Sequence, residues 1–442
     1  MSAPSPTIGL VSLGCAKNAV DLQVMAGHLV GAGFALAPVP DEADVVLVNT
    51  CAFIEQAREE AVAEILRACE LKARGLCRAV VVAGCFVQRY GARLAERFPD
   101  VDAWLGVDSI DRVVSIAKKA LSRKPAKAAA CSFAPGLPKR LFEPPVPALR
   151  LTGKAFAYLK IAEGCAHRCA YCAIPLIRGK YRSRSLRSIL KETRSLVATG
   201  CRELNVIAQD PMLWREGKKS LPDLLWALDK IPGDFWVRVL YSYPSEISED
   251  FLVWMLTSKH AVRYIDVPLQ HTVPEVLEKM NRKAAIADSL AAAEFLRDVV
   301  PGITLRTTIM TGFPGETEAR FRKLMADLRR MQFDHLGCFA YSPEKGTKGA
   351  LLGGRPSRAV ALAREKAVMG LAKEIWKARS KRSVGKVFRA LVVAPGVARL
   401  ESQAPDVDGV TYIDGNGVAV GDFIDVRIKS VKGFDFVAEV VG

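Results

Sequence analysis

The sequence predicts an α/β protein of three parts: a doubly wound α/β domain, a parallel array of six β/α units, and a small β-barrel. Three observations predict this order. Apolar runs alternate with helical patterns up to about residue 340, and a segment rich in proline and alanine interrupts them. Short alternating strand patterns with turn signals follow residue 383, as in Asp414-Gly-Asn-Gly417. A chain of 442 residues, half of them hydrophobic, can build several such units.

The first predicted domain, residues 1–130, has a cysteine at the end of each of three apolar runs. These are Cys15, Cys51 and Cys85, which lie 36 and 34 residues apart, and those intervals fit strand–helix–strand units with right-handed crossovers. Parallel strands place their carboxyl ends on one edge of a sheet, and neighbouring strands lie about 4.8 Å apart. We therefore expect the three cysteines to converge and to hold a metal cluster. Buried thiols with a packing role are the alternative.

The segment from residue 131 to 150 is predicted to be a linker because prolines crowd it, namely Pro135, Pro138, Pro144, Pro145 and Pro147. A β/α domain is predicted over 151–374 and the β-barrel over 375–442. The six predicted strands of the β/α domain are 156–161, 203–208, 235–241, 263–267, 304–310 and 333–341. Active-site residues of such arrays follow the strands. The candidates are Cys165, Gln209, Asp210, Tyr243, Pro244, Gln270, His271, Gly312 and Ser342.

Cys165, Cys169 and Cys172 have a spacing that suits an iron–sulfur cluster held by three thiolates, with one iron left open for chemistry. Cys201 follows 29 residues after Cys172, beyond a basic stretch, and is a poor fourth ligand. A zinc knuckle and three buried thiols are the alternatives, although structural zinc usually takes four protein ligands. The cysteines without a partner pattern are predicted to be structural: Cys69, Cys77, Cys131, Cys201 and Cys338.

The segment Cys165–Cys172, with Tyr171 before its last cysteine, resembles the signature of the radical S-adenosylmethionine (SAM) superfamily. The resemblance implies that SAM chelates the open iron, that reduction yields a 5′-deoxyadenosyl radical, and that the six strands form a partial barrel. It also implies that the glycine-rich turn Thr311–Thr317 approaches the adenosyl group. The residues it suggests for the cofactor pocket are Tyr171, Glu203, Gln209, Gly312 and Gly315. No individual catalytic residue is assigned.

The order of the three parts resembles the methylthiotransferases, which replace a C–H bond with C–S–CH3. The matching motifs are Leu13–Asn18, Asn49–Phe53, Gly84–Cys85, Pro175–Gly179 and Pro268–His271. The resemblance implies that Cys165, Cys169 and Cys172 hold a radical SAM 4Fe–4S cluster. It also implies that Cys15, Cys51 and Cys85 hold an auxiliary 4Fe–4S cluster, which carries an extra sulfide or methylsulfide. It implies that one SAM donates the methyl group and another makes the radical, and that the carboxyl-terminal barrel is of the TRAM type.

Two branches of that family differ in substrate. One modifies an adenosine of tRNA, and the other modifies the β-carbon of an aspartate on ribosomal protein twelve of the small subunit. The motifs Val206–Asp210, Leu240–Pro244 and Arg399–Gly409 resemble the ribosomal-protein branch, although Pro211 replaces an expected small hydroxyl residue. The predicted partner is that protein, free or in the assembled small subunit. A tRNA methylthiotransferase and a non-catalytic iron–sulfur RNA-binding translation factor are the alternatives.

The net charge of +16 and the pI near 9.4 favour an anionic partner. Two basic runs, 178–194 and 377–389, are candidates for contact with ribosomal RNA, and solvated helix faces are the alternative for both. Residues 390–426 instead carry one base against six acids, which suits a basic protein partner better than phosphates. The start of the chain has no targeting pattern and no apolar run of about 18 residues occurs, so a cytoplasmic protein without membrane contact is expected.

Overall fold

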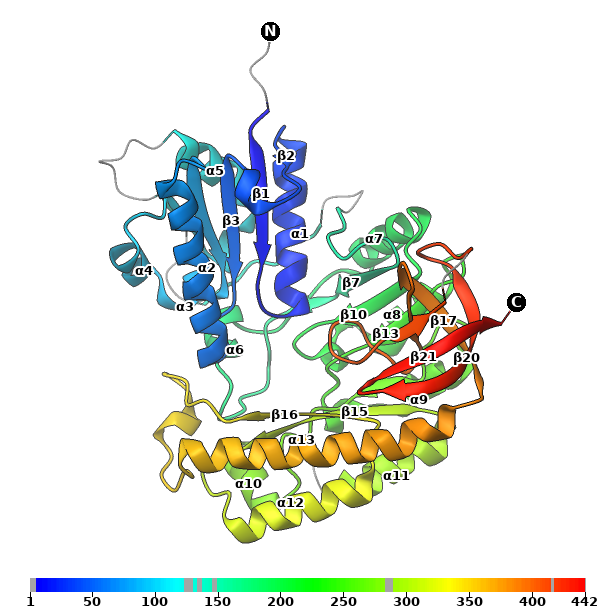
Figure 1. Ribbon diagram of the computed structural model, residues 1–442. Helices are drawn as coiled ribbons and strands as arrows, with labels where there is room; N and C mark the ends of the chain where they lie inside the picture. The colour runs from blue at the N-terminus through cyan, green and yellow to red at the C-terminus, as the bar shows by residue number, and fades with distance from the viewer. Residues whose placement is uncertain are drawn as a thin grey trace. The chain divides into compact units, whose positions relative to one another are not determined.

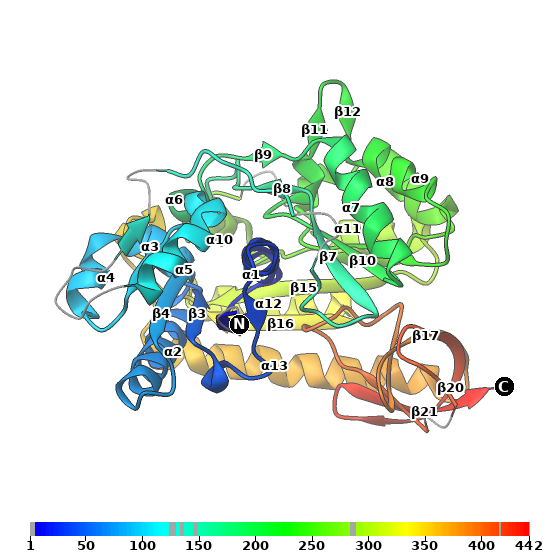
Figure 2. The ribbon, with the colours of Figure 1, turned by 90° about the horizontal axis from the view of Figure 1, so that it is seen from above.

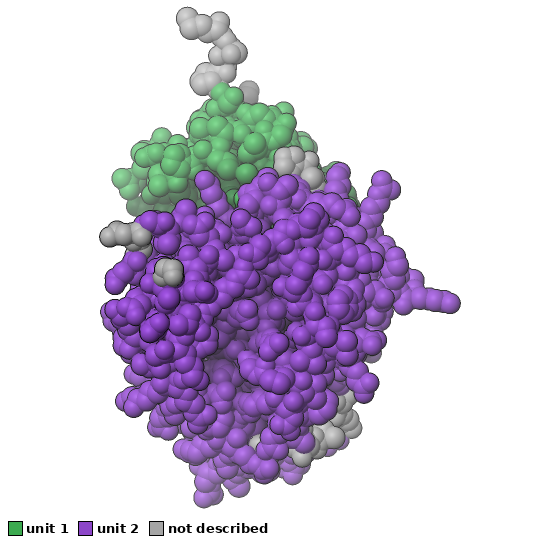
Figure 3. Space-filling view, turned by 90° about the vertical axis from the view of Figure 1, so that its right-hand side faces the viewer, with its two compact units in different colours: residues 1–151, 162–167, 172–184 green, residues 152–161, 168–171, 185–442 purple. Residues whose placement is uncertain are grey.

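The computed structural model describes residues 5–122, 130–132, 137–144, 149–282, 289–414 and 417–441. The chain forms two compact units, which Figure 3 shows in separate colours. Unit 1 comprises residues 1–151, 162–167 and 172–184, and unit 2 comprises residues 152–161, 168–171 and 185–442. Within the described ranges, the helices are all too short or too polar to cross a membrane.

Unit 1 is built on a six-stranded sheet in which every strand pair is parallel (Figure 1). From edge to edge the strands are β2 (Ala35–Leu36), β1 (Thr7–Ser12), β3 (Val45–Thr50), β4 (Ala79–Gly84), β5 (Ala103–Leu105) and β6 (Ala130–Ser132). The three strands that precede the cysteines, β1, β3 and β4, are direct neighbours. The predicted convergence of their carboxyl ends is therefore confirmed.

Helices cover both faces of this sheet, as the doubly wound prediction requires. In β4, Val80 and Val82 pack on the side of α2 (Glu55–Ala73), α3 (Cys85–Tyr90) and α4 (Ala92–Arg97). Ala79 and Val81 pack on the other side, against α1 (Ala16–Gly31) and α5 (Val113–Leu121). A strand that is buried on both faces reads as one continuous apolar run, and each fully buried valine contributes about 1.5–3 kcal/mol.

The sheet reaches into the segment predicted to be a linker, because β6 includes residues 131 and 132. Pro138 and Pro144 of that segment are described, whereas Pro135, Pro145 and Pro147 lie outside the described residues.

Unit 2 contains the six predicted strands of the β/α array in two parallel three-stranded sheets. The first sheet is β7 (Phe156–Lys160), β10 (Glu203–Ile207) and β13 (Trp236–Val239), and the second is β14 (Tyr264–Asp266), β15 (Thr304–Thr311) and β16 (His335–Ala340). A parallel bridge between Val237 and Ala261 and a bond from the Ser242 N–H to the Asp266 carbonyl join the two sheets. The result is an open array of six strands, as predicted.

Five of the described helices of unit 2 begin after a serine or threonine that caps them. The helices of this unit are α7 (Leu186–Ala198), α8 (Leu221–Asp229), α9 (Glu249–Thr257), α10 (Pro274–Lys279), α11 (Ser289–Val299), α12 (Glu318–Met331) and α13 (Arg358–Ser380). Those with such a cap are α7, α8, α9, α12 and α13, whereas α10 follows Val273. Ser185, Ser248, Thr317 and Ser357 each accept a hydrogen bond from a backbone N–H of the first turn, and Ser220 forms a capping box. Each such cap contributes about 1 kcal/mol.

The last part of the chain is a closed five-stranded barrel at the end of α13 (Figures 1 and 2). Its strands, in order around the barrel, are β17 (Val387–Ala394), β18 (Val397–Leu400), β19 (Thr411–Ile413), β21 (Asp435–Val441) and β20 (Phe423–Lys432). Trp376 of α13 belongs to the core of this barrel, and its indole N–H donates to the Gly433 carbonyl at 2.9 Å. The helix and the barrel therefore share one core.

Candidate functional site

Two of the three strand-end cysteines, Cys15 and Cys85, follow a glycine whose backbone conformation other residues rarely adopt. Gly14 and Gly84 precede Cys15 and Cys85 and have φ angles of 89° and 99°, which non-glycine residues rarely adopt. A Cβ atom on Gly14 would lie 2.6 Å from the Cβ of Cys51, so a side chain there would force the Cys15 and Cys51 loops apart. The glycines thus allow the first two cysteines to approach each other.

Asn18 joins the three cysteine loops. Its side-chain Nδ2 donates to the carbonyl of Leu13 at 2.7 Å and to that of Thr50 at 3.2 Å, just before the first two cysteines. Its Oδ1 lies 3.8 Å from the Sγ of Cys85. The side chain is fully buried, so these bonds replace solvent for all of its polar atoms. One amide therefore sets the spacing of all three loops.

The thiols of this triad influence one another electrostatically. Burial raises the pKa of the Cys85 thiol to about 12, the positive charge of Arg178 opposes that rise, and neighbouring Cys51 and Cys15 add to it. Burial, followed by the neighbouring Cys15, also raises the pKa of Cys51. Buried thiols of this kind ionise when a metal binds them. The donor set therefore suits a thiolate-held cluster whose assembly releases protons.

Within unit 1, the segment after Cys172 docks directly on this edge of the sheet. Helix α6 (Ile174–Arg178) packs on α3, and Ala173 and Ile177 share a hydrophobic cluster with Cys85 and Phe86. At the end of α6, the Nη2 of Arg178 donates to the Sγ of Cys85 at 3.1 Å. The loop that carries Cys172 is therefore anchored at the strand-end cysteines.

The second triad lies on the loop between β8 (Ala162–Glu163) and α6. Gly164, before Cys165, has a φ of 79°, and a Cβ there would lie 2.2 Å from the Lys180 carbonyl oxygen. Cys172 Sγ accepts a hydrogen bond from the N–H of Ile174 at 3.4 Å. All three cysteines of this triad are partly exposed.

Within unit 2, Arg282 serves Cys169 and Tyr171. Its Nη1 donates to the Tyr171 hydroxyl at 3.2 Å and lies 3.7 Å from the Cys169 Sγ. Its guanidinium also lies 4.3 Å above the ring of Tyr243. Each cysteine triad thus has a buried arginine next to one of its sulfur atoms, Arg178 for the first and Arg282 for the second.

Both triads fit 4Fe–4S clusters by their donor chemistry. No three His, Cys, Asp or Glu side chains in the described part of the chain lie close enough to hold one metal ion. A cubane cluster does not need such a set, because each of its cysteine ligands binds a different iron atom. Of the cysteines predicted to be structural, Cys77 and Cys201 are buried, Cys69 and Cys338 are partly buried, and the Cys131 side chain lies outside the description.

The suggested cofactor pocket is partly reassigned by the structure. Tyr171 is buried beside Phe313 of the glycine-rich turn, and Gln209 follows the carboxyl end of β10. Packing within the protein explains why glycine occupies positions 312 and 315. A Cβ at Gly312 would lie 2.3 Å from the Cβ of Ala361, and a Cβ at Gly315 would lie 2.7 Å from Lys279 Nζ. Their N–H groups donate within the protein, to the Glu316 carboxylate and the Gly354 carbonyl.

The placement of Glu203 in this pocket is wrong. Glu203 is the first residue of β10, so it lies at the amino end of the array, whereas the cysteine loop follows the carboxyl ends. Its carboxylate is fully buried and paired with Arg238 at 2.8 Å and with Arg399 of the barrel domain. Glu203 fastens the small barrel to the β/α array.

Two residues at the carboxyl edge of the β/α array have a strained backbone conformation. Tyr241 and Gln270, just past β13 and β14, have φ angles of 70° and 71° although neither is glycine. Such conformations cost about 1–3 kcal/mol each and concentrate at functional sites.

Pro211 is compatible with its loop, because it is the first residue of a short 3-10 helix, where no N–H is needed.

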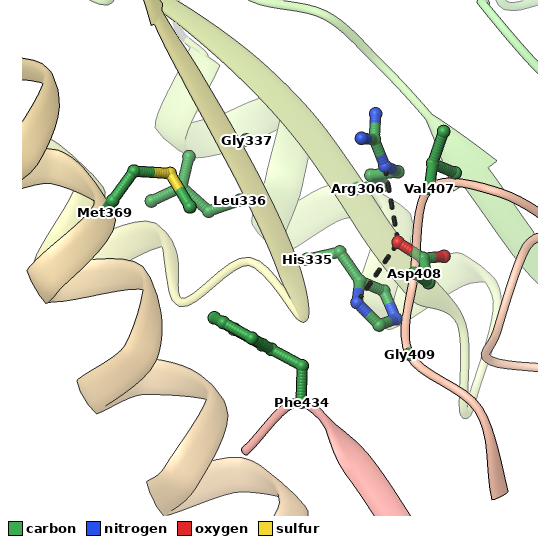
Figure 4. Close-up of a pocket in the computed structure, with 9 residues that line it drawn as sticks. All are labelled: Arg306, His335, Leu336, Gly337, Met369, Val407, Asp408, Gly409 and Phe434. Carbon is green, nitrogen blue, oxygen red and sulfur yellow. Dashed lines mark ion pairs between the residues drawn. The ribbon is translucent and has the colours of Figure 1, made fainter.

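The acids predicted to attract a basic partner are not all on the surface. Asp408 lies at a cavity of about 330 Å³, where its carboxylate contacts Arg306 at 3.4 Å and His335 at 3.3 Å (Figure 4). Asp406 accepts a hydrogen bond from Tyr158 at 2.6 Å. Both acids bind the barrel to the β/α array, but only the Asp408 side chain is buried, since Asp406 is exposed. The charge count of residues 390–426 is therefore larger than the acidic surface by that one carboxylate.

The first basic run is likewise not one surface. Arg178 and Arg184 are 2% and 1% exposed, whereas Arg187, Lys191 and Arg194 of α7 are exposed. Asn18, Asp21 and Arg282 carry no sequence-based prediction, and Arg178 carries one only as a member of the basic run 178–194. Asn18 is the last residue of the motif Leu13–Asn18, and Arg178 is the last but one of the motif Pro175–Gly179. Their place in these motifs is the sequence signal that points to a role for both.

Comparison with known proteins agrees with this architecture. Three family models match: "Uncharacterized protein family UPF0004" over residues 7–106, the radical SAM superfamily over 159–328, and the TRAM domain over 384–441. The structure is similar in fold to the radical SAM methyltransferase TsrM of Kitasatospora setae, solved with cobalamin and a [4Fe-4S] cluster. The TM-score is 0.55 at 18% identity, over 89% of this chain and 80% of that one.

Two curated relatives are similar over almost the whole chain. Ribosomal protein uS12 methylthiotransferase RimO of Opitutus terrae is 39% identical over 98% of this chain and 96% of its own. The protein of the same name from Heliobacterium modesticaldum is 40% identical over 98% of this chain and 95% of its own. SAM and 4Fe–4S clusters are the cofactors that go with these matches. The chain therefore belongs to the RimO family of radical SAM methylthiotransferases.

Proposed function

We propose that this protein inserts a methylthio group at the β-carbon of an aspartate of ribosomal protein uS12, by radical SAM chemistry that uses two 4Fe–4S clusters. One observation carries the proposal. The segment with Cys165 and Cys172 is anchored, through α6 and Arg178, at the sheet edge where Cys15, Cys51 and Cys85 emerge. Sulfur insertion needs a radical source and a sulfur source near each other, and this anchoring supports that arrangement.

The residues would divide the work as follows. Cys165, Cys169 and Cys172 hold the radical SAM cluster, and the strand-end triad holds the auxiliary cluster. When bound, SAM and the clusters supply the carbon-centred radical and the sulfur that replaces a C–H bond. Tyr171 and Arg282 orient the loop around Cys169, and Asn18 spaces the loops of the auxiliary site.

The choice of uS12 as substrate rests on the named relatives and on the motifs of the loop after β10. The acidic residues of segment 390–426 add less support, because part of them has a structural role. The test compares a strain that lacks this gene with its parent. Intact-mass and peptide mass spectrometry of uS12 should show one methylthio group in the parent only. A modified uS12 in the deletion strain, or a missing methylthioadenosine in its tRNA instead, would contradict the proposal. The second result would favour the tRNA branch.

We also propose that the protein contacts ribosomal RNA, and a basic groove in unit 2 supports this. Lys373, Lys377 and Lys381 recur every four residues along one side of α13 and its end, and with Lys429 of β20 they line a groove of about 430 Å³. Lys429 also pairs with Glu439 at 2.8 Å. Such a groove can neutralise phosphates and release their counterions, which makes binding salt-dependent.

The groove is tested by charge reversal. Replacement of Lys373, Lys377 and Lys381 by glutamate should weaken binding to small ribosomal subunits and flatten its salt dependence, by roughly 0.7–0.9 in the log–log slope per lost phosphate contact. A matched variant reverses Lys218, Lys219 and Lys230, which are exposed elsewhere in unit 2. Equal effects of the two variants would refute a specific RNA groove.

The non-catalytic alternative is tested with purified protein. Anaerobically reconstituted enzyme with a strong reductant should convert SAM to 5′-deoxyadenosine and methionine. Stoichiometric zinc without acid-labile sulfide would instead support a structural metal centre and an RNA-binding role.

A further inference from the structure

The guanidinium of Arg178 is buried in unit 1 and has four acceptors. The side chain is 2% exposed. Its Nη1 donates to the carboxylates of Asp21 at 2.5 Å and Glu163 at 3.2 Å. Its Nη2 donates to Asn18 Oδ1 at 3.0 Å and to Cys85 Sγ at 3.1 Å. These four residues come from α1, β8 and the start of α3, so one side chain joins three separate elements.

We propose that Arg178 is a positioning residue that raises the reduction potential of the auxiliary cluster by donating to the thiolate of Cys85. The inference rests on the proposed function, because it requires a cluster on Cys15, Cys51 and Cys85. It adds a residue role that does not follow from the cysteine pattern.

The direction follows from charge. Reduction adds an electron to a cluster, so a nearby positive charge and an N–H donor at a ligand sulfur stabilise the reduced form. The Cys85 side of the site is buried, where water screens the guanidinium poorly. Asp21 and Glu163 hold the guanidinium in place, and without it they would leave two negative charges beside the sulfur.

A purely structural ion pair would not need this geometry. One carboxylate is enough to pair a buried arginine, and a desolvated pair often adds little stability compared with apolar packing. Here both protons of Nη2 point to Asn18, which spaces the cysteine loops, and to the sulfur itself. The side chain is therefore oriented toward the cluster ligand and away from solvent.

The experiment isolates the auxiliary cluster in full-length protein in which Cys165, Cys169 and Cys172 are replaced by alanine. Iron and sulfide are counted first, and the cluster is then titrated with mediators and followed by electron paramagnetic resonance. Arg178→Gln should shift the potential to more negative values and alter the spectrum. Arg178→Lys keeps the positive charge but loses the two-pronged guanidinium donor, so it should shift the potential less than Arg178→Gln does. The matched control is Arg140→Gln, which removes the same charge from an exposed pair with Asp111 in unit 1.

The outcomes separate the two claims. If the triple-alanine parent binds no iron–sulfur cluster, the proposed function fails and this inference fails with it. If the parent binds a cluster and Arg178→Gln shifts its potential no more than Arg140→Gln, only the inference fails. Should the glutamine variant lose its iron, the lysine variant decides: a lower potential supports the proposal and an unchanged one overturns it.

Discussion

The Nη2 of Arg178 and the Sγ of Cys85 lie 3.1 Å apart, although 93 residues separate them in the sequence. This contact joins a motif after the second cysteine triad to a ligand position of the first. It is possible because α6 packs on α3 through Ile177 and Phe86, so apolar burial brings the charged group to the sulfur. Within unit 1, the contact links the segment that follows Cys172 to the strand-end triad.

Asn18 should prove necessary for the auxiliary site. Asn18→Ala removes the donors to the Leu13 and Thr50 carbonyls, and each buried carbonyl left without a donor costs about 1–3 kcal/mol. We expect a lower urea midpoint of the metal-free protein and less iron after reconstitution. Thr199→Ala serves as the control: it removes hydroxyl bonds of an exposed residue to the Ser195 and Leu196 carbonyls and should change the stability by less than about 0.5 kcal/mol. Full iron content and wild-type stability in Asn18→Ala would refute this role.

Gly164 should be essential for the radical SAM loop, whereas Gly153 should not. Both have positive φ angles, of 79° and 83°, so alanine is strained at either position by about 1–2 kcal/mol. Only at Gly164 would the new Cβ collide with backbone, at the Lys180 carbonyl, because nothing lies within 4 Å of a Cβ at Gly153. Displacement of Cys165 should reduce 5′-deoxyadenosine formation on the order of 100-fold in Gly164→Ala. Equal rates in the two variants, measured by chromatography, would contradict this account.

Glu203 should stabilise the protein in a pH-dependent way. Burial opposes ionisation, but Arg399 and Arg238 outweigh it and lower the pKa of Glu203. A lowered folded-state pKa means that this stabilisation is present above about pH 4.3, the ordinary glutamate value, and is lost as the pH falls through the lower value. Glu203→Gln leaves two buried guanidinium groups without their carboxylate and should cost about 3–5 kcal/mol near neutral pH.

The check is urea unfolding of both proteins between neutral pH and pH 3. The difference between wild type and Glu203→Gln should shrink toward the acid end. A difference that grows with acidity, or none at pH 7, would show that the ion pair does not fasten the barrel.

The segment between β18 and β19 should hold the small barrel through two tyrosine hydroxyls. Tyr158 donates to Asp406 at 2.6 Å and Tyr264 donates to Asp408 at 2.7 Å. Each tyrosine-to-phenylalanine change should cost about 1.5–3 kcal/mol, since the acceptor is charged. Faster proteolysis within residues 399–409 should accompany the loss. Tyr412→Phe, on an exposed strand position, should have neither effect. If all three variants behave alike, the docking role is refuted.

Much of the fold could be predicted because its signals are local. Fully buried parallel strands such as β3 and β4 read as uninterrupted apolar runs, and the cysteine that follows each is next to it in sequence. The six strands of the β/α array carry the same kind of local apolar signal. The three-cysteine spacing within residues 165–172 is also local, so the resemblance to the superfamily does not depend on tertiary contacts.

The roles that escaped prediction depend on partners far away in sequence. Arg178 looked like part of a basic run, but Asp21, 157 residues earlier, holds it in the interior. The resemblance to the superfamily suggests Glu203 for the cofactor pocket, but Glu203 begins its strand and its carboxylate pairs with Arg399 of the barrel domain, 196 residues later. Asp408 looked like surface charge for the same reason. A charge pattern alone does not show which charges are buried in pairs.

The most direct test of the central claim is an iron and sulfide count with Mössbauer spectroscopy on anaerobically reconstituted protein. The wild type should hold about eight iron atoms in two cubane clusters. Replacement by alanine of Cys15, Cys51 and Cys85, or of Cys165, Cys169 and Cys172, should leave about four in each case. Wild-type protein with about four iron atoms, all of them lost when the second triad is replaced, would contradict the account.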